Sequence, residues 1–129
     1  MNKVNGIFPI PAKTLGNFYK LWLEFIRPLH NLTSKEIEVT ASILKHRYYL
    51  TQKISDPVLL DEILLNSDSR IKIKEDCNIT SQYFQVMMGE LRKKRVIIDG
   101  TINPKFIPLI RTGESKFDLL LHFEWDVDK

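Results

Sequence analysis

Cysteine, glycine and long apolar runs are scarce in this sequence. Its 129 residues include one cysteine, Cys77, and five glycines. A single thiol cannot form an internal disulfide or begin a cysteine-based zinc site, and no glycine-rich phosphate-binding loop is present. Residues 1–10 contain no apolar run long enough for a signal sequence or a membrane span. We therefore expect a protein of a reducing compartment, the cytoplasm, with no membrane partner.

The residue types that carry catalysis and metal binding are present but are not grouped. The histidines fall on three different predicted elements: His30, His46 and His122. The C-terminal carboxylates are interpreted as a solvated face and not as an acid–base pair: Asp118, Glu124, Asp126 and Asp128. Since no nucleophile motif appears either, we expect no catalytic residue, no metal site, no cofactor and no enzyme activity.

Composition is that of a folded protein, with 43% apolar and 27% charged residues. The length suits one compact domain spanning residues 1–129. The net charge of +3 is unevenly distributed. Residues 70–95 contain seven basic and three acidic side chains, whereas residues 114–129 contain two basic and five acidic ones. Clustered basic charge of this kind favours a polyanion as partner of the central segment.

The first part of the chain predicts helices after a short arm. Glycine and prolines punctuate residues 1–12, which favours an extended arm. Apolar residues at steps of three and four then predict a helix over 14–29, with Pro28 marking its end. A Thr-Ser-Lys-Glu capping box at residues 33–36 predicts a second helix over 34–49.

Two short helices with a tight connection are predicted next. Ser69 is the expected N-cap of a helix over 70–77, and Thr80 is the expected N-cap of a helix over 81–94. Only residues 78–79, an asparagine and an isoleucine, stand between them. Asparagine tolerates the left-handed backbone that such a turn needs, and the isoleucine can fill the angle between the helices.

The last third of the chain has the patterns of β structure. Residues 96–98 predict a strand, the Asp-Gly pair at 99–100 is a hairpin signal, and 101–102 begin the returning strand. A further strand is expected over 106–111. Residues 114–129 alternate between apolar and mostly polar side chains, which predicts a half-buried C-terminal strand.

Residues 69–108 resemble a winged helix-turn-helix domain. The apolar residues fall where that family packs its two helices together: Ile73, Cys77, Ile79, Phe84, Met87, Met88 and Leu91. The run Leu91-Arg-Lys-Lys-Arg-Val-Ile-Ile-Asp-Gly is similar to the basic end of a recognition helix leading into the wing. The resemblance implies a mainly α fold with a small antiparallel β wing or sheet, an α+β arrangement with an extended N-terminal arm and a C-terminal β-strand.

The same resemblance implies a DNA-binding face on the helix over 81–94. Its outward side chains would meet the major groove: Ser81, Gln82, Tyr83 and Gln85. The basic run would contact phosphates: Arg92, Lys93, Lys94 and Arg95. The leading hypothesis is therefore a non-enzymatic protein that reads duplex DNA, of bacterial or phage origin.

A second hypothesis assigns the same fold a structural role. Winged helices also serve as protein-interaction scaffolds, and a basic helix end is also what the helix dipole and solvation favour. The chain would then be an assembly subunit, such as a small component of a phage virion, and would be found in the host cytoplasm or the virion. It would form a homo-oligomer or bind a partner protein through the arm 1–12 or the C-terminal strand 114–129. Under the DNA-binding hypothesis the protein would act as a dimer, with the helix 14–29 as either its dimerisation element or part of the core.

Overall fold

The computed structural model describes residues 6–110 and 113–127. In these residues the chain is mainly helical with a small two-stranded antiparallel sheet, which confirms the predicted α+β class. The helices, in chain order, are α1 (Leu15–Phe25), α2 (Arg27–His30), α3 (Ser34–Thr51), α4 (Pro57–Leu64), α5 (Ser67–Cys77) and α6 (Ser81–Lys93). The strands β1 (Ile97–Ile98) and β2 (Thr101–Ile102) follow, then a 3-10 helix (Pro104–Phe106). No described helix is both long and apolar enough to cross a membrane.

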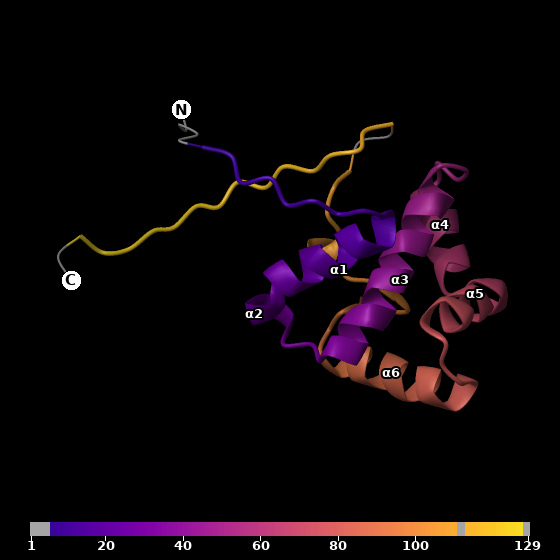
Figure 1. The fold of residues 1–129 in the computed structure, drawn as a ribbon. Coiled ribbons are helices and arrows are strands. Elements are labelled where there is room, and N and C mark those ends of the chain that lie inside the picture. The colour runs from indigo at the N-terminus through magenta and orange to yellow at the C-terminus, as the bar shows by residue number, and fades with distance from the viewer. Residues whose placement is uncertain (1–5, 111–112, 128–129) are drawn as a thin grey trace.

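Helix α3 is the central element of the fold and packs against α1, α4, α5 and α6. Figure 1 shows it crossing the middle of the helical body. The predicted capping box begins it: the Thr33 hydroxyl accepts from the Glu36 amide, and the Glu36 carboxylate accepts from the Thr33 amide. Its buried side chains form the centre of the core: Ile37, Val39, Ala41, Ile43 and Leu44.

The helix predicted over 14–29 is divided in two. α1 ends at Phe25, Ile26 leaves helical geometry with φ −96° and ψ 16°, and α2 follows as a single turn. Pro28 explains the break, because proline has no N–H to donate to the carbonyl four residues earlier and its ring clashes with that carbonyl. The apolar stripe was therefore identified correctly, but it belongs to two helices.

His30 in α2 is buried with both ring nitrogens bonded to the backbone. The Leu32 amide donates to Nδ1 at 2.9 Å, so Nε2 carries the proton and donates to the Leu23 carbonyl at 2.7 Å. Burial lowers the pKa of His30 below its ordinary value. The ring is thus held neutral as a link between α1, α2 and the start of α3.

Helix α5 begins earlier than predicted, at Ser67, with Asn66 as its N-cap. The prediction of Ser69 as the cap was wrong. Ser69 is buried inside the first turn, where its hydroxyl donates to the Ile63 carbonyl at 2.7 Å and lies 2.8 Å from His46 Nε2. Both Asn66 and Ser69 suit an N-cap by residue type. Packing against α3 and α4 decides between them.

The connection between α5 and α6 has the predicted form. Asn78 adopts the left-handed conformation, with φ 53° and ψ 52°, and Thr80 caps α6 through the Tyr83 amide. Ile79 is half-buried against the core that Phe84, Met88 and Leu91 form with their neighbours.

The hairpin is also as predicted. Ile97 pairs with Ile102 and Ile98 with Thr101. Asp99 and Gly100 both have positive φ, 53° and 78°, as a type I′ turn requires. The strand predicted over 106–111 is absent from its described part, residues 106–110. Asn103 caps a 3-10 helix that begins at Pro104, and this turn replaces the start of the strand.

Two segments lie outside the helical body (residues 14–110). The N-terminal arm, residues 6–13, contains no helix or strand, as predicted for the described part of 1–12. The C-terminal arm, residues 113–127, contains no strand, so the predicted strand over 114–129 is contradicted in this range. Alternating apolar and polar residues give an extended segment one apolar face. A β-strand also needs a neighbouring strand to pair with its backbone N–H and C=O groups. Figure 1 shows this arm running away from the body.

Candidate nucleic-acid interface

Helix α6 has one buried and one exposed side. Phe84, Met87, Met88 and Leu91 are buried in the core at helical spacing. The predicted base-contacting residues are all exposed on the other side: Ser81, Gln82, Tyr83 and Gln85. Figure 1 shows α6 along one edge of the body, at the opposite end of the view from the two arms. The exposed side is therefore open along its length.

A lysine on α5 extends this surface at the beginning of α6. Lys74 Nζ donates to Ser81 Oγ at 2.9 Å. Its ammonium thus lies beside the first turn of α6, where the helix dipole also favours anions. Sequence reasoning did not include Lys74 in the site, because it lies on the first of the two helices and not on the helix over 81–94. The lysine's position across the turn could be found only from the fold.

The four basic residues at the end of α6 do not share one role. Arg92, Lys93 and Arg95 are exposed, and Lys93 is the only one of these three in an ion pair within the described residues, at 3.5 Å from Glu90. Lys94 instead turns inward. Its Nζ lies 2.6 Å from Glu36 Oε1 and donates to the Asn31 carbonyl at 3.2 Å. The predicted phosphate contact of Lys94 thus competes with a structural ion pair.

Glu36 is almost completely buried, with 3% of its surface exposed. Burial raises the pKa of its carboxyl, but the hydrogen bonds from Lys94 and from the Thr33 amide more than offset this, so the pKa lies below its ordinary value. The carboxylate is therefore charged and depends on Lys94 for neutralisation. This pair joins the end of α6 to the beginning of α3.

Arg95 stands at a position that usually holds glycine. It follows the C-cap Lys94 with φ 62°, and the Val96 amide returns to the Leu91 carbonyl at 2.9 Å. This is the Schellman arrangement, in which the left-handed residue is most often glycine because a Cβ is disfavoured there. The strained backbone presents a guanidinium group at the exposed end of α6.

Gly89 shows the opposite mismatch. It lies inside α6, four residues after Gln85 and three before Arg92, on the exposed side. A Cβ placed on Gly89 would have no neighbour within 4 Å, so packing does not require a glycine. Glycine in a helix interior costs about 1 kcal/mol relative to alanine. The absence of a side chain leaves the helix backbone open to close approach, and sequence reasoning did not single it out.

No protein-family model, no curated protein and no solved structure matches the chain.

The tip of the hairpin has the wrong charge for a phosphate contact. Asp99 lies at the turn, and Thr101 Oγ1 donates to Asp61 Oδ1 of α4 at 3.1 Å. Asp61, Glu62 and Asp99 line one depression with Arg70 between α4, α5 and the hairpin. Negative charge at the tip repels DNA phosphates. The hairpin instead connects α6 to α4 through its two strands. The candidate site therefore consists of the exposed side of α6 with Lys74 and Arg95, without the hairpin tip.

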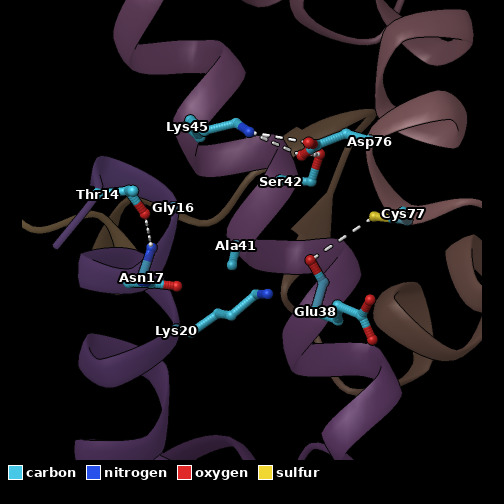
Figure 2. Close-up of a pocket in the computed structure, with 10 residues that line it drawn as sticks. All are labelled: Thr14, Gly16, Asn17, Lys20, Glu38, Ala41, Ser42, Lys45, Asp76 and Cys77. Carbon is cyan, nitrogen blue, oxygen red and sulfur yellow. Dashed lines mark hydrogen bonds and ion pairs between the residues drawn. The ribbon is translucent and has the colours of Figure 1, made fainter. Parts of the chain in front are cut away.

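A second polar site lies between α1, α3 and α5. The space between them is a cavity of about 180 Å³. Figure 2 shows Lys45 and Ser42 of α3 pointing toward Asp76 of α5 at this cavity. Asp76 accepts from Ser42 at 2.7 Å and from Lys45 at 2.9 Å. Burial raises the pKa of Asp76, and these two bonds more than offset it, so the pKa is lowered. The cluster neutralises itself, and its contacts hold α5 against α3.

The described residues contain no group of three or more histidine, cysteine or acidic side chains placed to hold a metal ion. His46 and Ser69 link α3 to α5, and His122 lies on the C-terminal arm beside Glu124. The three histidines thus lie in three different parts of the structure: α2, α3 and the C-terminal arm.

Proposed function

We propose that the protein is a winged-helix DNA-binding protein, without enzyme activity, that places the exposed side of α6 in the major groove. The observation that supports this most is the division of α6. Its inner residues are buried, while its outer residues are mostly polar at the beginning and basic at the end, with the exposed Val86 between them. An α-helix with its side chains is about 10–12 Å in diameter, which suits entry into a major groove about 12 Å wide.

Roles follow from position along the helix. Gln82 and Gln85 can each donate and accept at the edge of an adenine, and Ser81 and Tyr83 can bond to bases or phosphates. Arg92, Lys93 and Arg95 supply phosphate contacts, together with Lys74 at the other end. Lys94 is held by Glu36, so we assign it to the fold.

Two residues support the proposal because the fold alone prefers other residues there. Arg95 occupies a backbone position that favours glycine, and Gly89 occupies a helix interior that favours alanine. Local conflicts of this kind are expected where a surface serves binding. An arginine at the helix end adds a charge for phosphate, and a glycine in the exposed stripe lets the partner approach the backbone.

The salt dependence of duplex binding tests the proposal. We expect the unmodified protein to bind duplexes at low salt, and removing a side chain that binds one phosphate should lower the log–log salt slope by about 0.9. Arg92→Ala should weaken binding to all duplexes equally. Gln82→Ala or Gln85→Ala should reduce discrimination between sequences by about 1–3 kcal/mol per base contact. Lys53→Ala is the matched control, an exposed lysine outside α6. Absence of affinity for any duplex at low salt would refute the proposal.

Substitutions that improve the fold separate binding from stability. Arg95→Gly should leave the fold intact or stabilise it by up to about 1 kcal/mol, and Gly89→Ala should stabilise it by a similar amount. Both should nevertheless weaken duplex binding, measured by fluorescence anisotropy beside thermal melts. If either variant becomes more stable and binds as well as the unmodified protein, that residue has no part in the interface.

A second candidate function is a structural subunit that uses the same fold as a scaffold in an assembly. The observation that favours it is the apolar content of the arms, where Ile7, Phe8, Phe123 and Trp125 are exposed. Deleting residues 1–12 or 116–129 should then abolish oligomers and leave a folded helical core. Retention of the same oligomer by both truncated proteins would remove the support for this candidate.

A further inference from the structure

The C-terminal arm carries an apolar face that the rest of the same chain leaves mostly exposed to solvent. Every second side chain from Phe117 to Trp125 is apolar, and the exposed fractions reach 76% at Phe123 and 78% at Trp125. Contiguous apolar surface rimmed by polar residues marks an interaction site. The arm needs an acceptor with an apolar surface of its own.

The first residue of this face shows what the arm binds. Phe117 is half-buried against α1, with its ring centroid 5.6 Å from that of Phe18 and 5.5 Å from that of Trp22, both edge-on. Edge-to-face aromatic pairs at this spacing are favourable beyond the area that they bury. Helix α1 is thus a surface on which Phe117, the first residue of the apolar face, already packs.

An exposed apolar stripe lies on α1 and α2 beside the site where Phe117 packs. Leu21 lies one turn from Phe18, and Phe25 lies one turn from Trp22. Leu29 of α2 follows one turn further, and all three are exposed. Their exposure shows that the arm of the same chain does not cover them, and Figure 1 shows the C-terminal arm running away from the body. One chain therefore contains both the apolar arm and an apolar stripe that could bind it, but the two do not pack together within that chain.

We infer that two copies of this chain exchange C-terminal arms, with residues 119–125 of each copy lying on the Leu21–Phe25–Leu29 stripe of the other, while Phe117 keeps its place on its own α1. The exchanged segment is long enough to cover the stripe, because extended chain from residue 119 to residue 125 spans about 20 Å, whereas eight residues of helix span about 12 Å. Exchange of one element between identical copies also gives a closed twofold dimer. This inference goes beyond the proposed function and does not depend on it.

Area and charge agree with a second copy as the occupant. A standard interface buries about 1,600 Å² in total, and buried aromatic side chains contribute about 150–250 Å² each. Phe123 and Trp125 of two arms, with Leu119 and Leu121 on the same face of each arm and the two stripes, approach this size. Residues 114–127 contain four acidic and one basic side chain, while residues 15–30 contain two basic and one acidic. The opposite charge signs favour the arm-to-helix pairing.

Mass measurement on the full chain tests the exchange without DNA. Light scattering over a range of concentrations should show a monomer–dimer equilibrium. The arm variant Phe123→Ser with Trp125→Ser should weaken dimerisation by about 30-fold or more, the effect of losing one interface hot spot. The matched control, His122→Ser with Glu124→Ser, alters the polar face of the same segment and should leave the dimer unchanged. Thermal melts check that each variant remains folded.

Mixing distinguishes exchange from other contacts. The acceptor variant Phe25→Ser with Leu29→Ser should also fail to dimerise alone. Mixed with the arm variant, it should form a heterodimer, because its intact arm meets the intact stripe of the other. A monomer at all concentrations, a dimer that tolerates the arm variant, larger open aggregates, or a mixture that forms no heterodimer would each overturn the inference. Since no nucleic acid is present, none of these results bears on DNA binding.

Discussion

The helical body and the C-terminal arm are both rich in apolar residues, but they use them differently. In the body, Leu23, Ile43 and Phe84 are buried in one continuous core. In the arm, Leu121, Phe123 and Trp125 are more than half exposed. The body repeats apolar residues at helical spacing, so each helix can turn its stripe toward the others. The arm repeats apolar residues at a spacing of two, which places them on one face of an extended chain. That face can be buried only against a surface outside the arm.

This difference separates stability from association. Substitutions in the body should change the free energy of unfolding, because they remove packing within one chain. Substitutions in the arm should change the mass of the particle and leave the unfolding of the body unchanged. Residue type alone does not distinguish the two cases, since phenylalanines occur in both.

The largest effect is expected at Phe84. Its side chain is 1% exposed, and the Arg70 guanidinium lies 6.0 Å from its ring centroid. Phe84→Ala should reduce the free energy of unfolding by about 3–5 kcal/mol because it leaves a cavity among α5, α6 and α3. Urea unfolding at low protein concentration measures this. Phe123→Ala is the matched change in the arm and should have almost no effect; equal effects would contradict the comparison.

A smaller loss is expected at Lys94. Lys94→Met should cost about 3 kcal/mol, because it leaves the buried Glu36 carboxylate without its counter-charge. Lys93→Met is the neighbouring control, because the Lys93 side chain is 77% exposed and its pair with Glu90 is worth little. Thermal and urea unfolding of the two variants should differ clearly. If both are equally stable, the Lys94–Glu36 pair does not anchor α6.

Stability of the body should also fall in mild acid. Burial lowers the pKa of both His30 and His46, so the unfolded chain takes up protons more readily than the folded one. Their contribution is complete above an ordinary histidine pKa of about 6.5 and is lost as pH falls toward the lowered folded values. Urea midpoints at pH 7.5 and 5.5 measure this loss. The dependence should be shallower in His30→Gln and unchanged in His122→Gln, which alters only the arm.

The smallest effect is expected from removing the arm. Deleting residues 119–129 should change the free energy of unfolding of the monomer by no more than about 0.5 kcal/mol, because the removed side chains are mostly exposed in their own copy. Phe117 is retained in this variant. Chemical unfolding at concentrations below dimer formation measures it, and a loss comparable to Phe84→Ala would show that the arm belongs to the core.

Features decided by neighbouring residues were predictable from the sequence. The capping box at Thr33, the left-handed turn at Asn78 and the Asp99–Gly100 hairpin each depend on a few adjacent residues, and the structure contains all three. The residues that the family resemblance implied for the outer side of α6, Ser81, Gln82, Tyr83 and Gln85, are also exposed. Local chemistry and the fold agree at these positions.

Features decided by distant residues were not predictable in the same way. Asn66 and Ser69 are equally good caps until packing places Ser69 against Ile63. Lys94 belongs to a basic run until α3 brings Glu36 to 2.6 Å from it. The C-terminal alternation predicted a strand, but no neighbouring strand lies in the described part of the chain. The family resemblance behind the DNA-binding hypothesis stays a prediction.

Cys77 makes the closure of α5 against α3 measurable in time. Burial raises the pKa of its thiol, and its Sγ donates to the Glu38 carbonyl at 3.8 Å. A thiol reagent reacts with the thiolate, so it should label the chain only when α5 swings away from α3 and exposes the sulfur. No other thiol competes, because the sequence contains one cysteine. The labelling rate of the unmodified protein therefore reports how often this helix opens, and duplex binding by α6 should slow it.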